Sequence, residues 1–146
     1  MSALVDGLSS AARSAVAPIA NLVARIYLGL VFFQSGLSKV EDWQTTMTQF
    51  RSEWLVPVLS PSISAWLATG GEIILSLLLI VGFFTRFAAS GLFIMVMIIE
   101  FIVFNGASAD SQYYYWMIIL GLLIGYGSDK LSFDAFLSRK KDRRFH

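Results

Sequence analysis

The sequence predicts an all-α integral membrane protein, a bundle of four spanning helices with both termini on the cytoplasmic side. Hydrophobic residues make up 56% of the 146 residues and charged residues only 14%, whereas soluble domains carry about 25% charged residues. A helix needs about 20 apolar residues to cross the hydrocarbon core. Four apolar runs approach or reach that length, and the whole chain, 1–146, is expected to form one membrane domain. The runs are residues 19–40, 63–84, 87–104 and 113–127.

The first run carries a stripe of charged and small residues. Its members recur at spacings of four and three, so they share one helix face: Arg25, Gly29, Phe32, Gly36 and Lys39. Small residues allow close helix packing, and cations in a membrane need a partner or water. The stripe is therefore expected to face the inside of the bundle. Residues 1–18, which precede the run, are interpreted either as a weakly amphipathic surface helix or as a frayed tail.

Residues 42–55 are predicted to form an amphipathic helix at the membrane interface, between the first two spans. Asp42 is placed to cap its start. Low net hydrophobicity combined with two tryptophans is typical of an interfacial helix. Because this helix follows Lys39 directly, it either covers that end of the bundle as a lid or serves only as an anchor. Its apolar face consists of Trp43, Met47, Phe50 and Trp54.

The second and third runs each carry one carboxylate inside the membrane, Glu72 near mid-span and Glu100 toward the far end. Such a carboxylate costs roughly 2.5–3.5 kcal/mol or more unless it is paired or protonated. At a rise of about 1.5 Å per residue, Arg25 is expected to reach Glu72, and Lys39 to reach toward Glu100. The result would be a buried seam of two cations and two carboxylates. A very short turn joins the two runs, and Thr85 is the expected N-cap of the third.

The fourth run begins with an aromatic cluster that is typical of a membrane-interface belt, and Trp116 is assigned to the outer end of the seam. The segment that follows, 129–146, holds six of the eleven cations. It is expected to bind anionic lipid on the cytoplasmic side. With four crossings, Arg13 and Arg86 fall on that same side, so the interfacial helix lies outside.

Composition also limits the chemistry. The chain has no cysteine, and its one histidine is the last residue, His146. No metal site and no intrinsic cofactor are therefore expected, because thiolate ligation is excluded and a protein-ligated haem or zinc centre is disfavoured. A net charge of +1 argues against nucleic-acid binding. Electrons would have to come from a partner or from a bound cofactor such as quinone.

Several of these residues together resemble the DoxX family. The first run contributes the pattern Arg25…Leu28-Gly29…Phe33…Gly36…Lys39, and the second contributes Glu72 and the turn Gly82-Phe83-Phe84-Thr85-Arg86-Phe87-Ala88-Ala89. Residues 127–134 are similar to the family's closing motif Gly-x-Gly-Arg-Leu-Ser-x-Asp, with Asp129 and Lys130 as departures. The resemblance covers about residues 20–136. The small and polar positions that carry it are Gly29, Gly36, Gly82, Thr85, Arg86, Gly127, Ser132 and Asp134.

The resemblance implies a four-helix inner (plasma) membrane protein of a bacterium or archaeon, with recurrent charged positions at Arg25, Lys39, Glu72 and Arg86. It also implies a link to redox systems that handle quinones, sulfur compounds or thiols. We therefore expect a membrane subunit or partner of a redox-linked complex, held by a partner protein or as a homo-oligomer. In the expected site, Glu72 and Glu100 relay protons, Arg25 and Lys39 tune their pKa values, and Trp116 lines the outer end.

Two other functions stay open at this point. The chain is alternatively a non-catalytic scaffold or assembly factor, in which the polar seam only holds the helices together. A second alternative is a small transporter or anion-binding carrier, although the sequence shows no clear inverted repeat or pair of broken helices.

Overall fold

The computed structural model describes residues 2–106 and 111–127, with side chains described from residue 16 onward. Within these ranges the chain is helical and contains no strand, which confirms the predicted all-α class. A π-helix, η1, continues α4 directly. The elements are α1 (Ser2–Glu41), α2 (Trp43–Ser52), α3 (Pro61–Val81), α4 (Thr85–Met97), η1 (Ile98–Val103) and α5 (Gln112–Tyr126).

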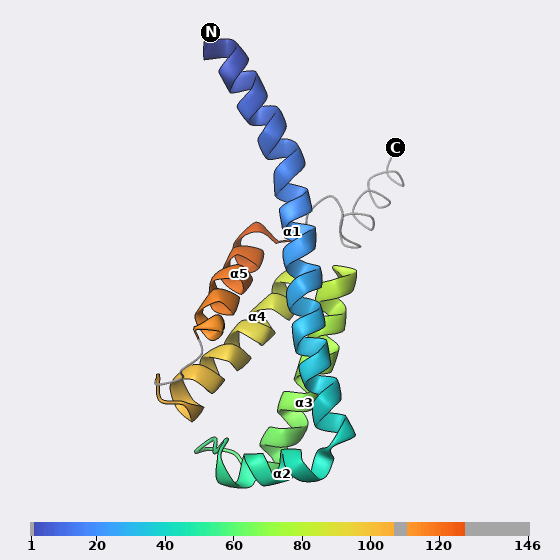
Figure 1. Ribbon diagram of the computed structural model, residues 1–146, viewed down its shortest axis with the longest axis vertical. Coiled ribbons are helices and arrows are strands. Elements are labelled where there is room, and N and C mark those ends of the chain that lie inside the picture. Colours follow the sequence, from blue (N-terminus) through green and yellow to red (C-terminus); the bar gives the residue numbers. More distant parts are fainter. Residues whose placement is uncertain (1, 107–110, 128–146) are drawn as a thin grey trace, which may run out of the picture.

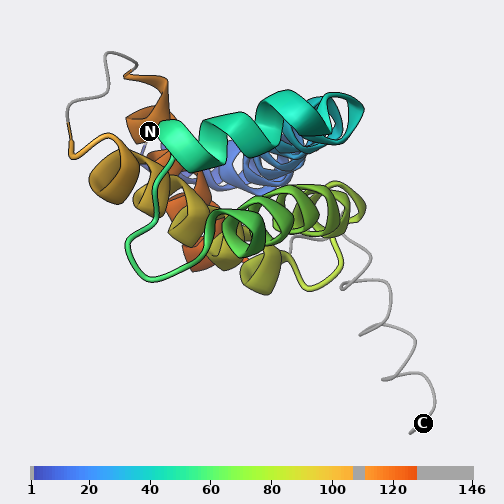
Figure 2. The same ribbon diagram turned by 90° about the horizontal axis from the view of Figure 1, so that it is seen from below.

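Four of the described helices, α1, α3, α4 and α5, lie beside one another, and α2 lies across one end of them (Figure 1). α1 packs on α3, α3 on α4 and α4 on α5, and α5 also contacts α1. Seen from below, α2 lies in front of α1 and next to α3 (Figure 2). We call this the α2 end of the molecule, and we call the opposite end, where Gly82–Phe84 connect α3 to α4, the turn end.

Three helical segments in the described part of the chain are long and apolar enough to cross a membrane. They are Val16–Glu41, Pro61–Val81 and Thr85–Val103, which match the first three predicted spans to within a few residues. The fourth predicted span corresponds to α5, which has 15 residues. Such a helix is about 22 Å long, shorter than a hydrocarbon core of about 30 Å. Four complete crossings and a cytoplasmic location of both termini therefore stay predictions.

The element boundaries follow from local chemistry. The Ser60 side chain accepts a hydrogen bond from the Ile63 amide at 3.4 Å, and Pro61 occupies the first turn of α3. Gly82 ends α3 in the left-handed region at φ 76°, which suits glycine. The expectation that Thr85 caps α4 is wrong: Phe84 holds the cap position at φ 49°, and the buried Thr85 is already helical.

The two ends of the chain bear on other expectations. α1 is continuous from Ser2 and includes Pro18, so the first residues are helical and do not form a frayed tail; their position at the membrane surface stays a prediction. The basic segment 129–146, together with the motif residues Ser132 and Asp134, lies outside the described residues.

α2 is docked on the bundle. Phe50 is buried, and the Trp43 ring lies 4.5 Å from the Trp66 ring of α3, measured between centroids. The predicted cap is confirmed, because Asp42 Oδ1 accepts a hydrogen bond from the Thr45 amide at 3.0 Å. Of the two interpretations offered for this segment, these contacts favour the lid.

The Asp42 cap predicts that the docking of α2 depends on pH. The backbone and side-chain hydrogen bonds of Thr45 lower the pKa of this exposed carboxyl below its ordinary value. A lowered folded-state pKa means that the stabilisation is complete above the unfolded-state pKa and is lost as the pH falls through the folded-state pKa. We expect the circular dichroism couplet of the Trp43–Trp66 pair to weaken below about pH 4. Asp42→Asn, which retains a capping side chain, should remove this acid step, and an unchanged acid step in that variant would contradict the assignment.

Candidate functional site

An ion pair between α1 and α3 is at the centre of the candidate site. Lys39 Nζ lies 2.7 Å from Glu72 Oε2 and 3.0 Å from Glu72 Oε1, and it also contacts Ser35 Oγ at 2.7 Å. Glu72 is only 3% exposed. The carboxylate is therefore held by a cation that reaches both of its oxygens, which is the arrangement that a buried charge requires.

Glycines on α1 bring the two helices close enough for this pair to form. A Cβ built on Gly36 would lie 2.7 Å from Ile73 Cγ1 and 3.2 Å from Glu72 Cβ. A Cβ on Gly29 would lie 3.2 Å from the carbonyl oxygen of Ser76. The stripe predicted from the sequence thus faces α3, and its glycines set the antiparallel register that places Lys39 beside Glu72.

This register corrects the predicted pairings. Lys39 was expected to reach Glu100, but it pairs with Glu72. Arg25 was expected to pair with Glu72, yet it lies eleven residues before Gly36, about 16 Å further along the helix axis. Arg25 is 1% exposed and lies toward the turn end. Depths taken for each span separately do not give these pairings, because the glycine contacts of α1 fix the position of α1 along α3.

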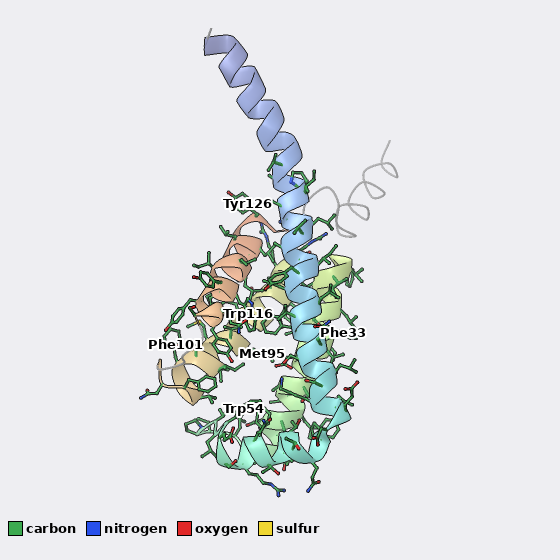
Figure 3. All side chains as sticks on the ribbon, in the orientation of Figure 1. Phe33, Trp54, Met95, Phe101, Trp116 and Tyr126 are labelled. Atoms are coloured by element: carbon green, nitrogen blue, oxygen red, sulfur yellow. The ribbon has the colours of Figure 1, made fainter. Side chains whose placement is uncertain are left out.

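A cavity of about 310 Å³ adjoins the ion pair. Its wall is mostly apolar, and its charged and hydroxyl-bearing side chains come from Ser35, Lys39, Ser64, Glu72 and Tyr113. Three further lining residues are labelled in Figure 3: Met95 and Trp116 lie between α1 and the α4–α5 pair, and Trp54 lies nearer the α2 end. The cavity therefore combines an apolar interior with one ion pair.

Aromatic rings shape two sides of the cavity. The Trp116 ring makes edge contacts with the Phe32 and Tyr113 rings, each with a centroid separation of 5.4 Å. On the α2 side, the Trp54 centroid lies 5.2 Å from that of Phe50 and 5.7 Å from Lys39 Nζ. Trp54 thus covers the ammonium group through a cation–π contact. Trp116, which the sequence placed at the outer end of the seam, lines the same cavity as the ion pair.

Glu100 belongs to a different environment. It is fully buried in the π-helix η1, and the Tyr114 side chain of α5 interacts with its carboxyl group. Its neighbours Ile99 and Val103 line the cavity, but Glu100 itself and Arg25 are not among the lining residues. The predicted continuous seam is therefore divided, with Lys39 and Glu72 at the cavity and Glu100 toward α5. π-helical turns are frequent at functional sites, but periodicity in the sequence did not indicate this one.

Arg86 and Gly127, two of the positions that carry the DoxX resemblance, contact each other at the turn end. Gly127 adopts φ 72°, and a Cβ there would collide with the Arg86 guanidinium. Asn21 Nδ2 of α1 donates a hydrogen bond to the Gly127 carbonyl oxygen at 3.2 Å. Arg86 and Gly127 therefore belong to a contact that joins α1, α4 and the end of α5, away from the cavity. Asn21 was not among the predicted site residues, although it lies four residues before Arg25 on the same helix face, and this spacing was a usable signal.

Sequence reasoning also missed Ser35 and Ser64. Ser35 lies four residues before Lys39, about 40° from it around the helix, and this spacing was a usable signal. Ser64 lies eight residues before Glu72, about 80° from it, so its spacing was a weaker signal. Within the described residues, histidine and carboxylate side chains form no group of three or more that could hold a metal ion.

Comparison with known proteins bears on identity. The family model described as DoxX matches residues 20–105, which is more than half of the chain and includes Lys39, Glu72 and Glu100. The chain is also 30% identical over 133 residues to an uncharacterized protein of Haemophilus influenzae (strain ATCC 51907 / DSM 11121 / KW20 / Rd), with 83% of this chain and 85% of that protein covered. No solved structure matches. The span-length apolar helices and the family match together confirm the resemblance seen in the sequence: the chain belongs to the DoxX family and is a membrane protein.

Proposed function

We propose that this chain is an integral inner-membrane subunit of a redox-linked complex, and that the cavity beside Lys39 and Glu72 holds a quinone headgroup. The observation that carries the proposal is an apolar, aromatic-lined cavity with one ion pair in its wall. Ligand pockets typically combine an apolar lining with a few convergent polar groups, in volumes from about 300 Å³ upward.

The residues of the cavity fit such a headgroup. A quinone has flat apolar faces, for which Trp54 and Trp116 provide packing surfaces. It also has carbonyl oxygens that accept hydrogen bonds. The three N–H donors of Lys39 Nζ already meet Ser35 Oγ and both carboxylate oxygens of Glu72, so a quinone carbonyl would share one of these donors. Glu72 is an acceptor for a hydroxyl group and can hold or release a proton at Oε1 or Oε2.

The proposed division of labour differs from the sequence expectation. A bound quinone would supply electron and proton transfer, and a partner protein would deliver the electrons, because the chain has no cysteine and only one histidine. Lys39 orients the ligand and Glu72 handles the proton. Arg25 and Glu100 act at a distance from the cavity, in packing or in proton exchange elsewhere. The basic segment 129–146 is proposed to hold the protein at anionic lipid on the cytoplasmic side.

The scaffold function is the alternative that a specific observation favours, because the Lys39–Glu72 pair also joins α1 to α3. Binding and assembly must therefore be measured separately. The double variant Lys39→Met with Glu72→Leu removes both charges together, so neither is left buried without its partner.

Tryptophan fluorescence can report occupation of the cavity. Replacing Trp43 and Trp66 by Phe leaves Trp54 and Trp116, which both line it; we call this the cavity-tryptophan background. In nanodiscs, decyl-ubiquinone should quench its emission saturably. The Lys39→Met/Glu72→Leu pair should weaken the apparent affinity about tenfold or more, since hydrogen bonds to charged groups contribute roughly 1.5–3 kcal/mol.

Arg51→Met provides the matched control, because it removes an exposed cation of α2 that does not line the cavity. Its affinity should be unchanged. Quenching that does not saturate and is equal in all variants would refute quinone binding. If quinone binding is absent and the double variant still supports a fully active partner complex after mild-detergent purification, the chain is a scaffold.

A further inference from the structure

The exposed fractions of the lining side chains show where the cavity opens to the molecular surface. Nineteen residues line the cavity, and only two of them have exposed side chains: Leu67 at 60% and Leu59 at 40%. Leu59 lies in the connection before α3, and Leu67 lies in the second turn of that helix. Both are apolar. The cavity therefore reaches the molecular surface through an apolar opening at the α2-end half of α3.

This opening lies on the membrane-facing side of α3. Ile63, Leu67 and Ile74 are exposed and fall within about 40° of one direction around the helix. Gly70 lies on the same stripe, and a Cβ there would meet nothing within 4 Å. Because α3 is one of the span-length helices, this stripe faces acyl chains. Leu67 is six residues from the start of α3, which is about 9 Å along the helix axis toward the middle of the bilayer.

The side of the cavity toward the membrane surface is covered instead. Phe50 and Trp54 of the lid lie over it, and Trp54 rests on Lys39. The ion pair is at the inner wall. Leu67 and Glu72 are five residues apart on α3, which is about 7.5 Å along the axis and roughly 140° around it. A molecule that reaches the ion pair from the mouth must therefore cross from the lipid face of α3 to its buried face.

We infer that the cavity opens sideways into the bilayer between Leu59 and Leu67, and that it takes a membrane-dissolved ligand whose polar head meets Lys39 and Glu72 while its aliphatic tail stays in the lipid beside α3. The inference rests on the proposed function only for the chemical identity of the head. It defines the ligand class as a tailed amphiphile. A water-soluble molecule of the same head chemistry would lack the contact along the Leu67 stripe.

Brominated phospholipids test the opening without any quinone. In the cavity-tryptophan background, bilayers with bromine on the acyl chains should quench Trp54 and Trp116, because chains enter the mouth. Leu67→Phe adds bulk at the mouth and should reduce this quenching by about half or more. Ile74→Phe is the matched control, because it adds the same ring to the same lipid-facing stripe at a residue that does not line the cavity; it should leave quenching unchanged.

Two further measurements complete the test. Far-ultraviolet circular dichroism and monodisperse elution establish that each variant folds, and Leu67→Met, which keeps the size of the side chain, should retain full quenching. Equal quenching in Leu67→Phe and Ile74→Phe would overturn the sideways opening, whatever quinone does.

Tail dependence is tested by a comparison between decyl-ubiquinone and the same headgroup without a tail. The tailed compound should bind at least tenfold more tightly when concentrations are expressed per lipid volume, and Leu67→Phe should reduce that advantage. Equal binding of both compounds would overturn the tail assignment. Failure of both to bind, with mouth-dependent lipid quenching intact, would refute the quinone head of the proposed function and leave the sideways opening supported.

Discussion

Replacement of Lys39 by Met should destabilise the helix bundle by about 3–5 kcal/mol, because it leaves the Glu72 carboxylate buried without its cation. Lys39 Nζ contacts both oxygens of this carboxylate, Oε1 at 3.0 Å and Oε2 at 2.7 Å. Protonation of Glu72 would relieve part of this cost. The change in the free energy of unfolding can be measured by titration from mild detergent into sodium dodecyl sulfate, with helicity as the signal.

The combined change Lys39→Met with Glu72→Leu should restore most of the stability, to within about 1–2 kcal/mol of the native chain, because paired apolar replacement of a buried ion pair is often neutral. Arg51→Met controls for loss of a positive charge and should have little effect, since surface charges contribute about 0–1 kcal/mol. If the double variant were as unstable as Lys39→Met alone, the cost would come from lost packing and the isolated carboxylate would not explain it.

Gly36→Ala should destabilise the protein although alanine favours helix by about 1 kcal/mol over glycine. The added methyl would meet Ile73 Cγ1 at 2.7 Å, Glu72 Cβ at 3.2 Å and the backbone nitrogen of Ile73 at 3.3 Å. Because one of these contacts is with backbone, which cannot move aside easily, we expect overpacking to lower the free energy of unfolding by about 1–3 kcal/mol and to displace α1 from α3. The Lys39–Glu72 pair should loosen in consequence, and quinone affinity in the cavity-tryptophan background should fall with it.

Gly70→Ala is the matched control for this change. It lies in α3, the helix opposite Gly36, and a Cβ there would meet nothing within 4 Å. This variant should be as stable as the native chain or more stable by up to about 1 kcal/mol, because only helix propensity changes. The same unfolding titration checks both variants. Equal effects of the two alanines would show that close approach of α1 and α3 does not depend on Gly36.

Sequence periodicity predicts where each helix lies and which of its faces is buried, but not how the helices pair. The lengths of the apolar runs predicted the three span-length helices, and the spacing of residues in α1 predicted that its stripe faces inward. Run length and residue spacing are both properties of a single helix. Asp42 was recognised as a cap from local chemistry, whereas the cap of α4 was displaced by one residue, to Phe84.

The pairing of charges depends on how helices slide against each other, and a single helix does not encode that. The contacts of Gly29 and Gly36 with α3 fix this register, so Lys39 pairs with Glu72 and Arg25 is carried toward the turn end. The spacing of apolar residues also did not reveal the change from α-helix to π-helix at η1, which contains Glu100. Likewise, the contact of Trp54 with Lys39 could not be predicted from helix periodicity, because Trp54 lies in the non-helical connection after α2.

The hydrogen bond from Asn21 to the Gly127 carbonyl joins residues that are 106 positions apart. During synthesis the N-terminal part of a chain is available first, so α1 and α3, which carry the ion pair, are made before α5. Trp116, which lines the cavity, belongs to α5. The cavity is therefore completed only after α5 has been made, and until then the Lys39–Glu72 pair lies beside an open flank that neighbouring lipids or an insertion chaperone must cover.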